Sequence, residues 1–290
     1  MQITRETLET DWLGACRRAT EGLREMLAAS PDTASRAVEM GTLGRGGDRT
    51  LVIDSRAESI VLAELEALRK RGYRFNAVSE ELGEVAFDGN EAGVRVVIDP
   101  IDGSLNAKRG VPHYALSIAV ATGSTMADVQ LAYVYDFGPA EEWWAIRGHG
   151  AMLNGARLDP SVPERRADDG RVEMLGLESA DPRWLAPSID VLVSLAYRIR
   201  ALGAIASTLC QVAAGRFDAM VTLRPCRAVD AAAGQLIVRE AGGLVSFVGF
   251  EDPLSAPLDM TAHAPLVAAR SESTLLALKQ LPRAGDGDLA

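Results

Sequence analysis

The sequence has little of what disulfide-linked, zinc-binding or membrane proteins require. It contains only three cysteines, Cys16, Cys210 and Cys226, and this odd number without CxxC or Cys/His spacing predicts neither a disulfide framework nor a zinc site. No apolar run reaches the roughly 18 residues of a membrane-spanning helix. The first residues also lack the basic region and apolar stretch of a secretory signal. We therefore expect a cytoplasmic protein that does not bind membranes.

Positive charge is scarce as well. The chain has 40 acidic and 30 basic residues, a formal net charge of −10, which opposes non-specific binding to nucleic acid because that depends on clustered Lys and Arg. The 290 residues are 48% hydrophobic, enough for a large core. We expect a single domain over residues 1–290, with lobes at about 1–160 and 170–275 and a polar hinge over residues 160–169.

An acidic corner near the middle of the chain organises the rest. The apolar run 94–98 leads directly into Asp99-Pro100-Ile101-Asp102-Gly103, which predicts a buried strand that ends in a rigid turn. Two carboxylates and the carbonyl of Ile101 form a donor set that suits Mg²⁺. Asp-Pro and Asp-Gly are also ordinary turn dipeptides, so the corner alone leaves a plain turn open.

Other acids stand at element boundaries, and each has an ordinary explanation. Glu80 and Glu81 follow a predicted strand at 75–78 and could form a solvated loop. Asp54 begins a predicted helix that stops at Gly72, and is typical of a cap or a first-turn acid. Asp230 precedes the helix-forming stretch 231–241, which predicts an N-cap. Only the set as a whole can decide among these alternatives.

The remaining pattern indicates helices and antiparallel strands. Apolar spacing predicts a helix at about 10–29, strands at 114–121, 129–135 and 142–146, and a hairpin at Asn154-Gly155. A strand at 172–177, a partly helical stretch at 185–195, a helix at 205–214 and a strand at 217–223 follow. The glycine-rich segment 41–50 is expected to be a mobile loop or plain connector. These elements alone give an α/β or α+β class.

Two longer stretches resemble signatures of the inositol monophosphatase family. DPIDGSLNAKRGVPHYALSIAV, from Asp99, is similar to the first signature, and VDAAAGQLIVREAGG, from Val229, to the second, in a match over about residues 48–247. Within the family, SEELGE at Ser79, DGSLNAKRGVPHYALSIAVA and the arginines of LRPCRAVD most resemble archaeal-type dual fructose-1,6-bisphosphatase/inositol-1-monophosphatases. The resemblance implies a layered α-β-α-β-α sandwich with the site between two lobes, and commonly a homodimer.

The resemblance also implies a Mg²⁺-dependent phosphate monoester hydrolase for a phosphorylated sugar or cyclitol, fructose-1,6-bisphosphate or inositol-1-phosphate or both. Two or three Mg²⁺ ions would be held by Glu80, Asp99, Asp102, Asp230 and the Ile101 carbonyl. The catalytic set would be Asp54, Ser104 and Glu80, in which Asp54 and Ser104 orient the metal-activated water and take its proton. Ser104 replaces the more frequent Thr, which keeps the hydroxyl but frees χ1.

Expected substrate contacts follow from the same resemblance, with the Gly103 and Ser104 amides around the phosphate. The set is Asp102, Gly103, Ser104, Arg200, Gly203, Ala204 and Arg224. Ala204 stands where the family often has Ser or Thr, which removes a polar contact. Arg224 lies where animal-type members have Glu, and a guanidinium suits a second phosphate, which favours the bisphosphate. Plain surface solvation is the alternative for Arg224 and Arg227.

Two other functions stay open at this point. A 3′-phosphoadenosine 5′-phosphate phosphatase has the same chemistry, although no stretch resembles an adenine-stacking element. A non-catalytic dimeric binding module would keep the fold alone. The acids Glu80, Asp99, Asp102 and Asp230 speak against this module, because clustered carboxylates repel one another and would be lost from an inactive site.

Overall fold

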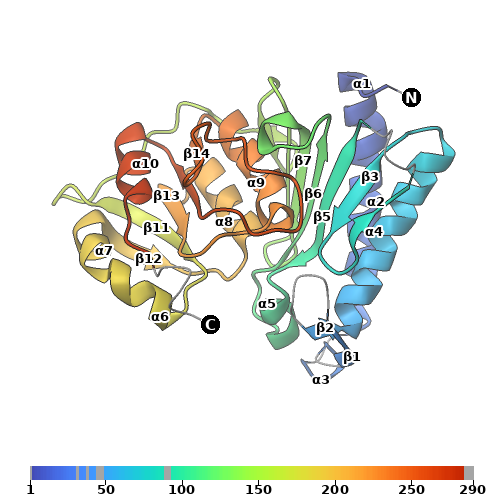
Figure 1. The fold of residues 1–290 in the computed structure, drawn as a ribbon, viewed down its shortest axis with the longest axis horizontal. Helices are drawn as coiled ribbons and strands as arrows, with labels where there is room; N and C mark the ends of the chain where they lie inside the picture. The colour runs from blue at the N-terminus through green and yellow to red at the C-terminus, as the bar shows by residue number, and fades with distance from the viewer. Residues whose placement is uncertain (1, 31–32, 37–38, 44–48, 88–92, 284–290) are drawn as a thin grey trace.

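The chain folds into five alternating layers, which confirms the α-β-α-β-α arrangement. The structure is a computed structural model and describes residues 2–30, 33–36, 39–43, 49–87 and 93–283. Helices α2 (Leu13–Ala28) and α4 (Val52–Lys70) cover one face of the first sheet. Helices α8 (Ile205–Ala213) and α9 (Ala228–Glu240) lie between the first and second sheets (Figure 1). The fifth layer, beyond the second sheet, is helical.

The first sheet has the order β10-β9-β8-β7-β6-β5-β3-β4 among the described strands. All neighbours pair antiparallel except β3 and β5, which are parallel. Its strands are β3 (Asn76–Ser79), β4 (Gly83–Val85), β5 (Arg95–Asp102), β6 (Ala115–Ala121), β7 (Val129–Asp136), β8 (Glu141–Ile146), β9 (Ala151–Leu153) and β10 (Ala156–Arg157). The predicted antiparallel run and the Asn154-Gly155 hairpin are confirmed, with both turn residues at positive φ.

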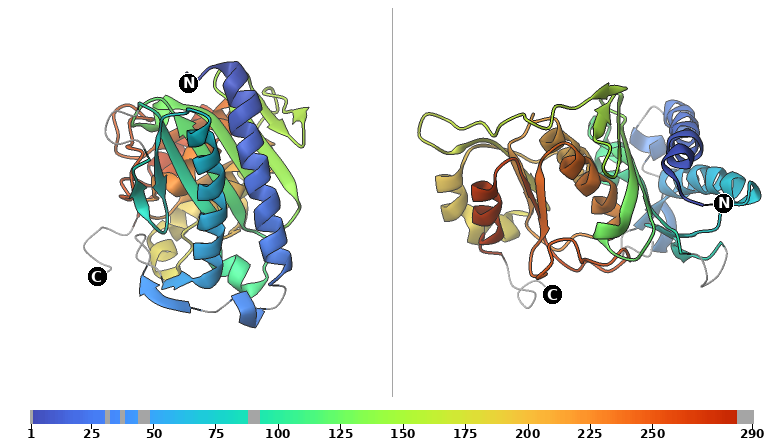
Figure 2. Two further views of the ribbon diagram at one scale, coloured as in Figure 1. Left: turned by 90° about the vertical axis from the view of Figure 1, so that its right-hand side faces the viewer. Right: turned by 90° about the horizontal axis from the view of Figure 1, so that it is seen from above.

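The second sheet is mixed and smaller. Its order is β12-β11-β13-β15-β14, with β11 parallel to β12 and β13 and the other pairs antiparallel. The strands are β11 (Val172–Glu178), β12 (Ala196–Arg200), β13 (Ala219–Thr222), β14 (Leu244–Phe247) and β15 (Leu266–Ala269). Its outer face packs on α7 (Ile189–Leu195) and α10 (Glu272–Lys279), as the view from above shows (Figure 2).

Short elements complete the chain. Helix α1 (Arg5–Thr7) leads through a wider turn at Leu8–Trp12 into α2, so this helical region begins earlier than position 10. Strands β1 (Glu39–Leu43) and β2 (Arg49–Leu51) pair at the ends of the glycine-rich segment, whose residues 44–48 lie outside the described residues. The other short helices are α3 (Thr33–Arg36), α5 (Ser104–Arg109) and α6 (Pro182–Leu185).

Small side chains let the two central helices meet closely. A Cβ added to Gly234 of α9 would lie 2.5 Å from Leu209 Cδ1 of α8, and Ala231, Ala232 and Ala233 are also buried. Close helix packing here places the first turn of α9 against the end of β5, where the site lies.

All three cysteines are buried and free, in agreement with the expectation of no disulfide. Within the described ranges, no helix is long and apolar enough to span a bilayer.

Two local expectations are wrong. Strand β5 continues through the acidic corner to Asp102, with a shift in its pairing to β6 between Asp99 and Asp102, so the corner is a bulged strand end rather than a turn after residue 98. Helix α9 begins at Ala228 behind Arg227, so Asp230 is the third helical residue and not the N-cap. Asp99 and Asp230 are residue types typical of element boundaries, but here β5 continues past Asp99 and α9 begins before Asp230.

Candidate active site

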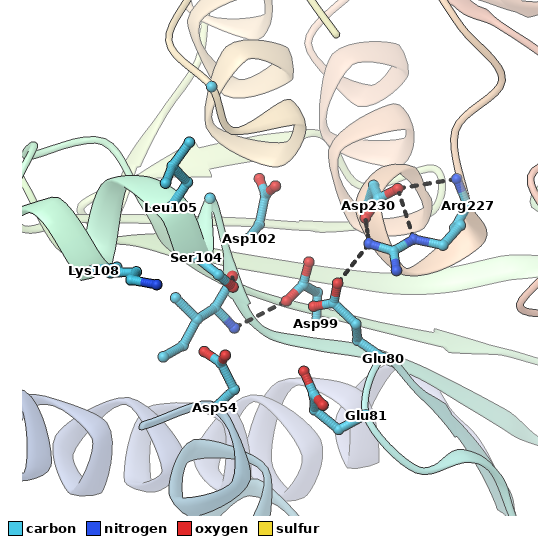
Figure 3. A pocket seen from close by; sticks show the side chains of 13 residues that line it. Asp54, Glu80, Glu81, Asp99, Asp102, Ser104, Leu105, Lys108, Arg227 and Asp230 are labelled. Carbon is cyan, nitrogen blue, oxygen red and sulfur yellow. Dashed lines mark hydrogen bonds and ion pairs between the residues drawn. The ribbon is translucent and has the colours of Figure 1, made fainter. Parts of the chain in front are cut away.

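A cleft of about 510 Å³ opens where β5 ends. Its walls come from the start of α4, the loop after β3, the end of β5, α5 and the start of α9 (Figure 3). It is lined by Asp54, Glu80, Glu81, Asp99, Ile101, Asp102, Gly103, Ser104, Leu105, Lys108, Gly203, Arg227 and Asp230. Every expected metal ligand and catalytic residue is in this set, although they come from segments up to 176 positions apart.

The end of β5 supplies the fixed part of the site. The backbone N–H of Ile101 donates to Asp99 Oδ1 over 2.9 Å, which orients this buried carboxylate. Asp102 accepts from the backbone N–H groups of Ile205 (3.2 Å) and Ala206 (2.6 Å) in the first turn of α8. Asp102 therefore links the first sheet to the central helical layer, and the helix N-terminus favours its negative charge.

Gly103 makes the sharp turn from β5 into α5. It has φ +88°, and an added Cβ would lie 2.9 Å from the His113 carbonyl oxygen and 3.1 Å from that of Gly203. Only glycine satisfies both conditions without a shift of backbone. The next residue, Ser104, donates its hydroxyl to the Ile101 carbonyl over 2.9 Å. The turn thus places the Ser104 hydroxyl beside the acidic corner.

Asp54 and Glu80 approach from the α4 side. Asp54 lies in the first turn of α4, as one of its alternatives predicted, and is buried against the cleft. One turn later, the buried Glu58 accepts hydrogen bonds from the Ser79 hydroxyl and the Leu82 N–H. These bonds hold the loop that carries Glu80. Glu58 carries a recognisable sequence signal, an acid on the apolar face of a predicted helix, but no role was expected for it.

The first turn of α9 supplies Asp230 together with a cation. Asp230 Oδ2 accepts from the backbone N–H of Arg227 over 3.0 Å. The Arg227 guanidinium Nη2 lies 2.6 Å from Glu80 Oε1 and 3.1 Å from Asp230 Oδ1, so it bridges the two carboxylates (Figure 3). Surface solvation, the alternative given for Arg227, is therefore wrong, because its side chain is only 19% exposed and lies in the cleft.

Burial and mutual repulsion dominate the electrostatics of this cluster. Burial raises the pKa of Asp99 well above its usual range, and repulsion from Glu80, Asp102 and Asp230 raises this pKa further. Burial, followed by repulsion from Asp230, likewise raises the pKa of Asp102. The pKa of Glu80 is also raised by burial, against the opposing attraction of Arg227. Such a cluster needs positive charge to keep its carboxylates ionised.

The donor set fits divalent magnesium, because it consists only of carboxylate and carbonyl oxygens. As the side chains stand, no three Asp, Glu, His or Cys residues of the described part are grouped closely enough to hold one ion. The fit therefore concerns the donor chemistry, and some side-chain rotation is needed for the donors to converge.

Comparison with known proteins then decides the family. Residues 9–284 match the inositol monophosphatase family. The chain belongs to this family. A match of this extent includes the five layers and every wall of the cleft described above.

Individual relatives agree with this assignment. The chain is 32% identical over 267 residues to the fructose-1,6-bisphosphatase/inositol-1-monophosphatase of Methanothermobacter thermautotrophicus, covering 89% of this chain and 91% of that protein. It is 36% identical over 235 residues to the Nus factor SuhB of Escherichia coli strain K12, covering 79% and 82%. The crystal structure of the MJ0109 gene product, an inositol monophosphatase-fructose 1,6 bisphosphatase, superposes with a TM-score of 0.77 at 28% identity, covering 93% and 99%.

These relationships identify the chain as a phosphoric monoester hydrolase of the inositol monophosphatase family. The family is generally metal-dependent, in accord with the oxygen-rich cleft. Its substrates are phosphorylated small molecules.

Only some of the residues expected to contact the substrate line the cleft. Gly203 lines the cleft with Asp102, Gly103 and Ser104, whereas Ala204 is buried beneath it at the start of α8. Arg200 and Arg224 line neither this cleft nor an adjoining one of about 410 Å³. Arg224 stacks on the Trp184 ring at 4.6 Å instead. The cleft cations in the described residues are Lys108 and Arg227, which sequence reasoning had not assigned.

Proposed function

We propose that the protein is a Mg²⁺-dependent phosphatase of fructose-1,6-bisphosphate, inositol-1-phosphate or both. The observation that carries this proposal is the convergence of Glu80, Asp99, Asp102 and Asp230 on one cleft from three separate elements. A surface module has no need to bury so much like charge. Hydrolysis of a phosphate dianion requires positive charge around the phosphate, which metal ions bound by such acids can supply.

The carboxylates of Glu80, Asp99, Asp102 and Asp230, with the Ile101 carbonyl, would hold two or three Mg²⁺ ions. When bound, these ions supply charge neutralisation for the phosphate, a nucleophile at neutral pH and stabilisation of the leaving oxygen. The chain itself contributes orientation. Asp99 is fixed by the Ile101 N–H and Asp102 by two N–H groups of α8, so these two donors are held before the substrate arrives.

Asp54 and Ser104 would position the attacking water and remove its proton. Both line the cleft, Asp54 from α4 and Ser104 from the start of α5. The Ser104 hydroxyl donates to the Ile101 carbonyl, which leaves its oxygen lone pairs directed away from that bond and able to accept from water. The backbone amides of Gly103 and Ser104 would contact the phosphate itself.

Ser104 provides a graded test of this role. We expect Ser104→Ala to lower kcat by about 10²-fold, the usual contribution of one group that positions or transfers a proton. Ser104→Thr should retain activity, because it keeps the hydroxyl and restricts χ1. Steady-state phosphate release for both variants at saturating Mg²⁺ measures this. Equal losses in the Ala and Thr variants would indicate a steric role for this position and contradict the assignment.

The second phosphate of a bisphosphate would be bound by Lys108 rather than by Arg224. Lys108 lines the cleft from the last turn of α5, whereas Arg224 is held against Trp184 outside it. We expect Lys108→Met to raise KM for fructose-1,6-bisphosphate about tenfold and to change KM for inositol-1-phosphate little, because the monoester has no second dianion. Arg224→Met is the matched control and should leave both values near wild type. A larger effect of Arg224→Met than of Lys108→Met would support Arg224 as the contact to the second phosphate.

A phosphate-release screen tests the proposed function as a whole. The substrates are fructose-1,6-bisphosphate, inositol-1-phosphate and 3′-phosphoadenosine 5′-phosphate, each with Mg²⁺ and with EDTA. Hydrolysis of either of the first two that requires Mg²⁺ supports the proposal. Hydrolysis of the nucleotide alone would favour the nucleotide phosphatase. No hydrolysis of any substrate would favour the binding module. The homodimer and the division into two lobes also remain predictions, which light scattering and limited proteolysis can test.

A further inference from the structure

We propose that Arg227 is a built-in counter-cation of the acidic cluster, and that its guanidinium must leave Glu80 and Asp230 before these carboxylates can converge on a divalent cation. Arg227 would then determine how tightly this chain binds its metal ions. The inference rests on the proposed metal-dependent function and concerns a residue to which that function gives no part.

The geometry of the guanidinium motivates this inference. One nitrogen, Nη2, contacts Glu80 Oε1 at 2.6 Å and Asp230 Oδ1 at 3.1 Å, while Nε lies 3.4 Å from Asp230 Oδ2. Glu80 and Asp230 come from the loop after β3 and from α9, so the cation joins two different walls of the cleft (Figure 3). It occupies the space between two donors that metal binding would bring together.

The charge balance explains why a cation belongs there. Six carboxylates line the cleft, those of Asp54, Glu80, Glu81, Asp99, Asp102 and Asp230. Arg227 makes ion pairs with two of them. Its positive charge relieves part of the repulsion when no metal is bound, and the same charge opposes the entry of a second cation.

Arg227 also has space into which it can move. Its backbone is extended at the N-cap of α9, with φ −84° and ψ 162°, so the residue stands just outside the helix, and Asp230 is its side-chain partner there. The residue lines both the main cleft and the adjoining one, which contains Asn106 and the buried carboxylate of Glu178. A rotation about its side-chain bonds would transfer the guanidinium from one cleft toward the other without a change in the fold.

Metal binding to Arg227→Met tests the inference directly. Methionine keeps much of the side-chain volume and removes the charge. We expect titration calorimetry with MgCl₂ to show a dissociation constant at least about tenfold lower than that of wild type. A tenfold change corresponds to only about 1.4 kcal/mol, and the repulsion between two close charges reaches that strength. In EDTA the variant should melt a few degrees below wild type, and saturating Mg²⁺ should remove this difference.

Two controls separate displacement from a general charge effect. Arg224→Met removes the same charge three residues earlier, where the guanidinium contacts Trp184 rather than the acids, and should leave Mg²⁺ affinity within about twofold of wild type. In wild-type protein with labelled arginine, the Arg227 Nε–H resonance, identified by its loss in Arg227→Lys, should shift on addition of Mg²⁺. An unchanged resonance at saturating Mg²⁺, or equal affinity in wild type and Arg227→Met, would overturn the inference.

These outcomes are distinct from failure of the proposed function. Unchanged Mg²⁺ affinity in Arg227→Met, together with normal Mg²⁺-dependent hydrolysis by wild type, would refute only the role of Arg227. Absence of Mg²⁺-dependent hydrolysis by wild type would refute the proposed function whatever the variant binds.

Discussion

Asp99→Asn is expected to lower phosphatase turnover by several orders of magnitude while the protein stays folded. Asp99 is the most deeply placed acid of the cleft at 1% exposure, and its Oδ1 is fixed by the Ile101 N–H. An asparagine keeps this acceptor and the side-chain volume but removes the charge that a Mg²⁺ ligand must supply. Phosphate release at saturating Mg²⁺ measures the loss, and circular dichroism checks the fold.

The same substitution should stabilise the metal-free protein. Burial, with repulsion from Glu80, Asp102 and Asp230, raises the pKa of Asp99, so its ionised form costs free energy in the folded state at neutral pH. In EDTA we expect the melting temperature of Asp99→Asn to exceed that of wild type by about 2–5 °C.

The pH dependence has a definite sign. Because the folded-state pKa is raised, the contribution of Asp99 to stability is fully present below the unfolded pKa and is lost as the pH rises through the folded pKa. The advantage of Asp99→Asn in EDTA should therefore grow from acidic toward neutral pH. Loss of activity without any gain in stability would point to a misfolded site. Full activity would contradict the assignment of Asp99 as a metal ligand.

The helices and strands could be predicted from the sequence because they leave local signals, whereas the acids were ambiguous singly and were brought together by the family resemblance. Apolar periodicity predicted α4, α8 and most strands to within a few residues. The order of layers came from the family resemblance, since periodicity does not say which sheet a helix covers. The sequence predicts too early an end for β5 because Pro100 and Gly103 are turn residues in most contexts, whereas here pairing with β6 resumes at Asp102.

The sequence does not distinguish which arginine lines the cleft. Arg224 and Arg227 are three residues apart in one basic run, and nothing local says which side chain enters the cleft. The start of α9 at Ala228 turns Arg227 toward Glu80, and the Trp184 ring holds Arg224 away. Trp184 lies 40 positions earlier in the chain, so only the tertiary fold distinguishes the two arginines.

Gly103→Ala should cost both stability and activity. The left-handed φ of +88° costs an alanine about 1–2 kcal/mol. Its Cβ would also lie 2.9 Å and 3.1 Å from the backbone oxygens of His113 and Gly203, which adds about 1–3 kcal/mol. We expect a fall in melting temperature of about 5–15 °C and a large loss of turnover, because the shift would move Asp102 and Ser104, its two chain neighbours.

Gly110→Ala is the matched control, since Gly103 and Gly110 cap opposite ends of α5. Gly110 has φ +71°, but an added Cβ would meet only Thr33 Cγ2 at 3.9 Å, an ordinary contact. This variant introduces only the backbone strain, so its melting temperature should fall by about 2–4 °C. Its turnover should stay near wild type, because Gly110 lies at the far end of α5 from Asp102. If both variants lost activity equally, the sensitivity would belong to the whole of α5, including Lys108. A loss confined to Gly103→Ala would show that catalysis depends on the tight approach of β5 to the backbone of His113 and Gly203.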